Sequence, residues 1–256
     1  MTRKSFMCGN WKMNATHLDA IQMVQKLSYR LELADYERVD VVVAPPFTAL
    51  RSVQTVIEAD HLAIELAAQN VHWQESGAYT GEVSPTMLAK LAVDYVIVGH
   101  SERRQLFGET DDTVNRKVKA VLAAGMTPIM CLGETLGQRE AGETEALVAA
   151  QVTAGLKGLT PDEVGKVIVA YEPIWAIGTG RTAEPDDAGA VCEFLRRRLG
   201  DEFSGSVSEE MRIIYGGSVN PGNVAALMAK NHIDGGLVGG ASLDPDTFAS
   251  IVRYWV

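Results

Sequence analysis

Cysteine is scarce in this sequence, which has only three, Cys8, Cys131 and Cys192, among 256 residues. So small and odd a number, without any Cys-x-x-Cys pair, excludes the disulfide framework of a small secreted protein. Apolar runs long enough for a signal peptide or a membrane span are also lacking. We therefore expect a protein of the reducing cytoplasm with no membrane partner.

Basic residues are outnumbered, with 23 lysines and arginines against 33 aspartates and glutamates, which gives a formal charge of −10. An acidic surface repels polyanions, so we expect no nucleic-acid partner. The five histidines show no His-Glu-x-x-His or similar ligand spacing, and a metal site is not expected.

Stretches rich in proline, glycine and serine that would mark a linker are absent as well, although 256 residues could hold two domains. Hydrophobic residues make up 46% of the chain, and a chain of this length can bury a full core. We therefore predict one domain over residues 1–256.

Eight short apolar, β-branched runs begin about 33 residues apart on average. Between them lie segments of helical periodicity, such as 18–31 and 188–199, and Pro185, Pro221 and Pro245 stand where helices should begin. Buried parallel strands that alternate with eight helices predict an α/β fold, a closed (β/α)8 barrel rather than an open doubly wound sheet. The predicted strands are Ser5–Cys8, Val39–Ala44, Leu62–Ala67, Asp94–Val98, Thr127–Leu132, Lys166–Ala170, Met211–Tyr215 and Gly236–Val238.

In a (β/α)8 barrel the loops that follow the strands carry the chemistry. Lys12 follows the first strand, where its ammonium could hold an anionic substrate or simply lie on the surface. His100 follows the fourth strand, at the predicted start of a helix whose dipole disfavours the imidazolium. A neutral imidazole there can donate a hydrogen bond to a carbonyl oxygen, although a structural histidine fits the same position.

Glu172 follows the sixth strand, where partial desolvation suits a carboxylate to general-base work unless it pairs with a lysine or arginine. The segment 173–183 has an apolar tip between Pro173 and small residues, which is typical of a lid. Residues 178–183 also match Gly-x-Gly-x-x-Gly/Ala. These glycines do not join a strand directly to its helix, so a dinucleotide site is not expected.

Paired glycines follow the seventh and eighth strands, in Tyr215-Gly216-Gly217-Ser218 and Gly239-Gly240-Ala241-Ser242. Backbone amides in such turns close on anions at helix N-termini, and barrels often place a phosphate at these two strands. Simple tight turns would also use glycine, but two such turns on neighbouring strands favour a phosphate site.

Five motifs together resemble the triosephosphate isomerase family, over essentially the whole chain and in the family's order. The resemblance implies a TIM barrel of glycolysis and gluconeogenesis, without cofactor or metal, that interconverts dihydroxyacetone phosphate and D-glyceraldehyde 3-phosphate through an enediolate. The motifs are Asn10-Trp11-Lys12, Gly99-His100-Ser101-Glu102-Arg103-Arg104, Tyr171-Glu172-Pro173 through Gly180, Tyr215-Gly216-Gly217-Ser218 and Gly239-Gly240-Ala241-Ser242.

The resemblance also implies a role for each matching residue. Glu172 would carry the proton between the substrate carbons, neutral His100 would polarise the carbonyl, and Lys12 would offset the substrate's charge. Substrate contacts would come from a wider set, which includes Lys12 together with Asn10, Gly178, Ser218, Gly239 and Gly240. Supporting positions would be Glu102, Cys131 as a packing thiol beside the glutamate, and Tyr215.

A long connection, residues 69–85, carries Trp73 and Tyr79, and two aromatics in one loop indicate that it packs against another surface. The resemblance implies that this loop inserts into a second subunit, with Thr80 reaching towards the partner's active site. We therefore expect a homodimer.

Two other functions compete with the isomerase. Another phosphosugar barrel, such as an epimerase, would keep the glycine turns but not the set Lys12, His100 and Glu172. A catalytically silent sugar-phosphate binding or surface-adhesion barrel would leave acid–base positions empty, whereas all of them are filled in this sequence.

Overall fold

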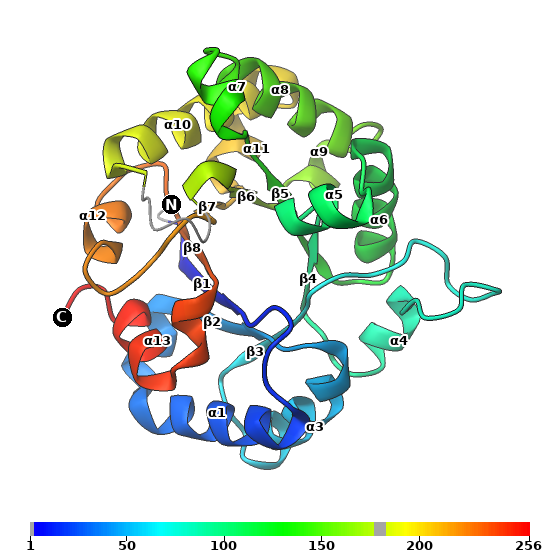
Figure 1. Ribbon diagram of the computed structural model, residues 1–256, viewed down its shortest axis with the longest axis vertical. Coiled ribbons are helices and arrows are strands. Elements are labelled where there is room, and N and C mark those ends of the chain that lie inside the picture. The colour runs from blue at the N-terminus through cyan, green and yellow to red at the C-terminus, as the bar shows by residue number, and fades with distance from the viewer. Residues whose placement is uncertain (1–2, 177–182) are drawn as a thin grey trace.

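Eight parallel strands form a closed barrel in the order of the chain, β1 to β8. The computed structural model describes residues 3–176 and 183–256, and Figure 1 shows the ring of helices that surrounds the strands. The predicted (β/α)8 barrel is therefore confirmed. The strands are β1 Ser5–Asn10, β2 Val39–Ala44, β3 Glu65–Ala68, β4 Tyr95–Val98, β5 Thr127–Leu132, β6 Ile168–Tyr171, β7 Ile213–Tyr215 and β8 Gly235–Val238.

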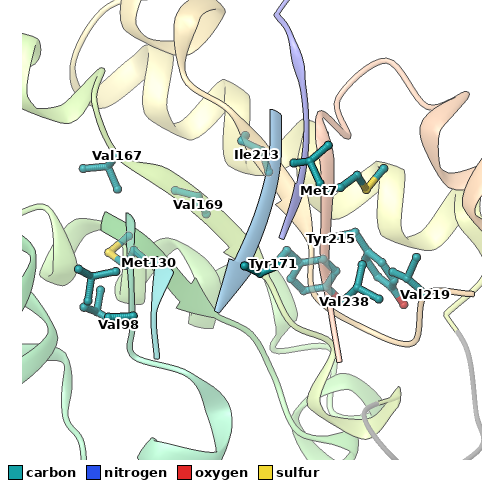
Figure 2. Close-up of a cluster of buried hydrophobic side chains, with 14 of the residues drawn as sticks. Met7, Val98, Met130, Val167, Val169, Tyr171, Ile213, Tyr215, Val219 and Val238 are labelled. Atoms are coloured by element: carbon teal, nitrogen blue, oxygen red, sulfur yellow. The ribbon is translucent and has the colours of Figure 1, made fainter. Parts of the chain in front are cut away.

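The side chains of the strands alternate between two apolar layers. One layer contains strand residues alone, such as Phe6, Cys8 and Ile97, and fills the inside of the barrel. The other combines the alternate strand residues with helix residues and lies between the strands and the helices. Figure 2 shows part of this outer layer, including Met7 and Tyr171. Because both faces are buried, the strands read as continuous apolar runs.

Several strand boundaries differ from the predicted ones. The predicted start of the third strand, at Leu62, is wrong by three residues, since β3 begins at Glu65. Leu62 and Ile64 are apolar because they pack on the core before the ladder begins. In the same way Val167 is buried ahead of β6, which begins at Ile168 and continues to Tyr171. β2 and β5 have the predicted bounds.

Several helices are preceded by a residue whose side chain caps their first turn. The hydroxyl oxygens of Thr16, Thr110 and Thr160 accept hydrogen bonds from the third backbone N–H of α1, α6 and α9. The described residues form more helices than the eight expected, and several of these helices are short. The helices are α1 His17–Arg30, α2 Leu33–Arg38, α3 Phe47–Ala59, α4 Pro85–Ala89, α5 Ser101–Phe107, α6 Asp111–Ala123, α7 Leu136–Glu140, α8 Thr144–Gly155, α9 Pro161–Val164, α10 Pro185–Glu202, α11 Gly205–Glu210, α12 Val224–Met228 and α13 Pro245–Val252, with 3-10 turns η1 Ile174–Ala176 and η2 Gly240–Leu243.

Two of the three prolines start helices as predicted, Pro185 in α10 and Pro245 in α13. The third prediction is wrong, since α12 begins at Val224 and Pro221 lies in a turn before it. There the side chain of Asn220 accepts a hydrogen bond from the N–H of Gly222 and closes a local turn. Across residues 3–176 and 183–256, none of the helices is both long and apolar enough to cross a membrane.

Candidate active site

The carboxyl ends of the strands surround one pocket of about 300 Å³. Its lining brings together residues that lie far apart in the sequence, because the C-terminal ends of all eight strands meet at one face of the barrel. The predicted site residues that line it are Asn10, Lys12, His100, Glu172, Ser218, Gly239 and Gly240. Gly178 lies outside the residues that the structure describes.

His100 is a neutral donor in this structure. It caps α5, and its Nδ1 accepts a hydrogen bond of 3.2 Å from the backbone N–H of Glu102. An Nδ1 that accepts carries no proton, so the proton of the neutral ring resides on Nε2. Nε2 lies 3.1 Å from Oε1 of Glu172 and faces the pocket. The predicted tautomer is thus the one that the hydrogen bonds require.

Glu172 follows β6, and its side chain is only 3% exposed. Its Oε2 accepts a hydrogen bond of 2.9 Å from the backbone N–H of Ser101, and its Oε1 lies 3.1 Å from Nε2 of His100. The alternative of a carboxylate neutralised by a lysine or arginine is wrong among the described residues, where none lies within ion-pair distance of Glu172 and the neighbour is this histidine. A buried carboxylate held by one backbone donor beside a neutral imidazole is suited to accept a proton.

Lys12 has an unusual backbone, with a φ of +53° that non-glycine residues seldom adopt. Side-chain amides bind both backbone polar groups of Lys12. The N–H of Lys12 donates to Oδ1 of Asn10 at 3.1 Å, and its carbonyl accepts from Nε2 of Gln69 at 2.8 Å. Lys12 lines the pocket, and its ammonium pairs with Glu102 at 2.6 Å.

Two glycine turns also line the pocket, at Gly216-Gly217 and at Gly239-Gly240. A Cβ at Gly239 would lie 3.9 Å from Nζ of Lys12, so this turn runs beside the ammonium. A Cβ at Gly216 would lie 2.8 Å from Cγ of Glu172, and one at Gly217 would lie 2.2 Å from the hydroxyl of Tyr215. A side chain at Gly216 or Gly217 would approach Glu172 or Tyr215 too closely, whereas a Cβ at Gly239 would make only ordinary contacts. An anion site at these turns, beside the ammonium of Lys12, stays a prediction.

The described start of the predicted lid is anchored to the barrel. Nε1 of Trp175, in η1, donates to Oε1 of Glu134 at 2.9 Å, and the hydroxyl of Tyr171 donates to the same oxygen at 3.1 Å. The guanidinium of Arg139 lies 4.9 Å from the centre of the Trp175 ring. Residues 177–182 of the segment 173–183 lie outside the described residues.

The supporting residues take different places. Glu102, on α5, holds Lys12. Cys131 lies inside the barrel, where burial, and next the charge of Glu172, raise the pKa of its thiol. Burial raises the pKa of Tyr215 to about 12, while the nearby backbone of Ala183 opposes the shift. Both groups therefore stay protonated and act by packing or by donating hydrogen bonds.

The loop 69–85 stands away from the ring of helices, just before α4 (Figure 1). Trp73 stacks on His72 with ring centres 4.2 Å apart, and Tyr79 packs on the same ring at 4.4 Å, so both loop aromatics contact their own chain. Tyr79 remains 44% exposed, and Thr80 beside it is exposed as well. Thr80 thus lies on the surface, outside the pocket of its own chain.

Sequence reasoning missed two contacts of the site. One is the backbone N–H of Ser101 that binds Glu172, and the other is the amide of Gln69 that holds Lys12. Ser101 lies inside a motif that was recognised, but a backbone N–H has no residue-type signal. The only sequence signal for Gln69 is that a polar residue follows the third strand.

Comparison with known proteins gives one consistent result. The profile of the family described as triosephosphate isomerase matches residues 5–255. A triosephosphate isomerase of Streptomyces coelicolor is 54% identical, over 99% of this chain and 98% of the relative. Those of Saccharopolyspora erythraea and Carboxydothermus hydrogenoformans are each 51% identical, over 98% of this chain and 96% and 98% of the relatives.

Proposed function

The chain belongs to the triosephosphate isomerase family, and from this membership we propose how its own residues interconvert dihydroxyacetone phosphate and D-glyceraldehyde 3-phosphate, an aldose–ketose isomerisation of glycolysis. The observation that carries the proposal is the convergence of a carboxylate, a neutral Nε2–H donor and an ammonium on one pocket. The relatives do not favour the silent binding or adhesion barrel.

The reaction moves hydrogens within one molecule. The Glu172 carboxylate takes a proton from C1 of dihydroxyacetone phosphate, and the electron pair of that C–H bond forms the C1–C2 double bond of the enediolate. The C2 oxygen takes up the negative charge against Nε2–H of His100, and the proton of the C1 hydroxyl passes to it. Glu172 then returns its proton to C2, which leaves the C1 aldehyde.

The charge of the enediolate needs more than a base. A positioned base contributes about 10²- to 10⁴-fold, or roughly 3 to 5 kcal/mol. A preorganised donor such as Nε2–H of His100 contributes about 2.7 to 4 kcal/mol in a site that excludes water. The ammonium of Lys12 adds to this, because it is held beside the glycine turn by a fixed backbone.

The phosphate would occupy the glycine turns. Backbone N–H groups of Gly178, Ser218, Gly239 and Gly240 would donate to it, while Asn10 would line the reacting end of the pocket. The segment 173–183 would close over the bound substrate and exclude water, since an enediol phosphate exposed to solvent loses phosphate before it is reprotonated. The anchored start of this segment, Trp175 on Glu134, supports a hinge at that point.

A coupled assay tests this function. D-glyceraldehyde 3-phosphate is supplied with a glycerol-phosphate dehydrogenase and reduced nicotinamide cofactor, so each dihydroxyacetone phosphate formed consumes one cofactor. We expect turnover without added metal. Folded protein without turnover would contradict the proposal.

We also propose a homodimer formed through loop 69–85. Its support is a second pocket of about 260 Å³ beside Lys12, lined by the apolar side chains of Met13, Phe47 and Phe107. Met13 is 95% and Phe107 67% exposed in the single chain. Apolar side chains clustered around a pocket are suited to receive a loop of a second copy, with Thr80 at its tip. Sedimentation velocity at micromolar concentration that showed only monomer would overturn the dimer.

We further propose that residues 1–256 form one domain and that the protein works in the cytoplasm. The closed barrel, whose inner and outer apolar layers share the same eight strands, supports the first, and three buried free cysteines support the second, since none is paired. A single cooperative unfolding transition and recovery of the protein in the cytoplasmic fraction are expected.

A further inference from the structure

The guanidinium of Arg104 joins the ends of two strands next to the catalytic histidine. Its Nε donates to the carbonyl of Gly99 at 2.7 Å, and its Nη2 donates to the carbonyl of Cys131 at 3.2 Å. β4 and β5 pair in register as far as Val98 with Met130, so Gly99 and Cys131 are the next pair along. Arg104 thus connects the two strands one step beyond their ladder.

Gly99 is the place where the chain leaves β4. Its φ of +71° lies in the left-handed region, and a Cβ there would lie 3.0 Å from the carbonyl oxygen of Cys131. Glycine is therefore required, yet glycine also has the greatest freedom to rotate. Side chains hold both of its polar groups, because its N–H donates to Oε1 of Glu109 at 3.0 Å and its carbonyl accepts from Arg104.

The imidazole of His100 depends on this peptide. His100 directly follows Gly99; its Nδ1 accepts from the N–H of Glu102, and its Nε2 lies 3.1 Å from Oε1 of Glu172. A rotation of the peptide between Gly99 and His100 would move the ring away from both partners. We propose that Arg104 is a positioning residue for His100, which fixes the Gly99 carbonyl and so aims Nε2–H at the reacting carbonyl. The proposal rests on the role of His100 given above.

An arginine is needed for the geometry. Its planar fork reaches three acceptors at once, the two carbonyls and Oδ1 of Asp111 at 2.6 Å. A lysine ammonium is a compact point donor that cannot span them. The neighbouring Arg103 cannot take over, because its Nε is engaged with Oε2 of Glu109 at 2.9 Å.

The test compares Arg104→Met with the wild type by two measurements. The first is kcat and KM in the coupled assay, where we expect kcat to fall by about 10- to 100-fold while KM changes little. The second is the ¹⁵N spectrum of histidine-labelled protein without substrate. The wild type should show His100 protonated at Nε2 alone, and the variant should lose this single tautomer. The spectrum reports on Arg104 even if the protein proved to have no isomerase activity.

Asp111→Ala is the matched control, since it removes the ion pair of Arg104 but leaves both carbonyl contacts. It should keep the wild-type spectrum and nearly all of the wild-type kcat. The kcat of Arg104→Lys should lie between those of Arg104→Met and Asp111→Ala. If Arg104→Met fails to fold, Arg104→Lys replaces it in the comparison. Wild-type kcat and spectrum in either Arg104 variant would overturn the proposal. So would equal losses in Arg104→Met and Asp111→Ala, which would mean that only the ion pair with Asp111 matters.

Discussion

Oε1 of Glu172 lies 3.1 Å from Nε2 of His100, so the proposed base and the proposed electrophile are direct neighbours. The backbone N–H of Glu102 donates to Nδ1 of the same ring, which leaves Nε2–H as the donor that faces the pocket. A substrate carbonyl that accepted a hydrogen bond from Nε2–H would therefore lie beside the carboxylate of Glu172.

Glu172→Gln should lower kcat by about 10²- to 10⁴-fold, because an amide cannot accept the carbon-bound proton. Its size is unchanged, and its carbonyl oxygen can still accept from the N–H of Ser101. Affinity for a non-reacting phosphorylated inhibitor should therefore change little, as measured by calorimetry. Glu210→Gln, at an exposed position on α11, is the control and should match the wild type. Equal losses in kcat and inhibitor affinity would mean that Glu172 is structural.

Gly217→Ala should disturb both the fold and the phosphate turn. The new Cβ would lie 2.2 Å from the hydroxyl of Tyr215 and 3.0 Å from Cγ of Pro173, and a rigid ring cannot move away cheaply. We expect the free energy of unfolding to fall by about 1 to 3 kcal/mol, as in other overpacked sites, and KM to rise. Chemical denaturation and the coupled assay measure the two effects.

Gly205→Ala is the matched substitution without a clash, since nothing lies within 4 Å of its Cβ position. Gly205 opens α11, where alanine is the better helix former, so this variant should be as stable as the wild type or more so, with unchanged KM. If both alanines behaved alike, the close approach of Gly217 to Tyr215 would have no consequence.

The architecture could be predicted because burial and strand periodicity coincide. β2 and β5 are apolar over most of the residues that pair in the ladder, and their bounds follow from the sequence. The bounds of β3 do not, since Ile64 is buried and Leu62 partly buried ahead of the strand. The turn at Pro221 was misread because the side chain of Asn220 competes with the helix for a backbone N–H.

The candidate site could be predicted in residue type and position, but not in its internal bonds. Lys12, His100 and Glu172 each follow a strand, and parallel strands bring their carboxyl ends to one face. Glu172 binds the N–H of Ser101, and Gln69 binds the carbonyl of Lys12. Both contacts use backbone groups, which every residue type has. Only coordinates give such pairings.

Thr80→Arg should weaken the proposed dimer. A long cation at the tip of loop 69–85 would meet the Lys12 pocket of the second copy, where like charges repel by several kcal/mol. We expect the dissociation constant to rise by about tenfold or more and specific activity to fall on dilution. Sedimentation velocity over a dilution series measures both states. Thr55→Arg, on the exposed side of α3, should leave the assembly unchanged, and equal effects of the two would exclude the loop as the contact.

At the opposite end of the barrel, Glu65 is a carboxyl with no lysine or arginine within ion-pair distance among residues 3–176 and 183–256. Its two oxygens accept from the hydroxyl of Tyr95 at 3.2 and 3.3 Å. The neighbouring Asp40 forms ion pairs with Lys4 at 2.7 Å and with Arg212 at 2.5 Å. Burial, then the charges of Asp40 and Asp94, raise the pKa of Glu65 to about 7, against the smaller opposing effects of Tyr95 and Arg212.

This raised pKa has a definite sign for stability. Between about pH 4.5 and 7 the unfolded chain has already lost the Glu65 proton while the folded protein keeps it, so the free energy of unfolding falls as pH rises and then levels off above pH 7. Glu65→Gln keeps an acceptor for Tyr95 but cannot ionise. It should therefore flatten this slope and stabilise the protein at pH 8 by roughly 1 kcal/mol, a value reduced for partial exposure. Urea denaturation at pH 5 and 8 measures it, and an unchanged slope would contradict the raised pKa. Glu163→Gln is the control of opposite sign. Hydrogen bonds with Thr160 lower the pKa of Glu163. The stability that these bonds give is present above the pKa of the unfolded chain and is lost in acid.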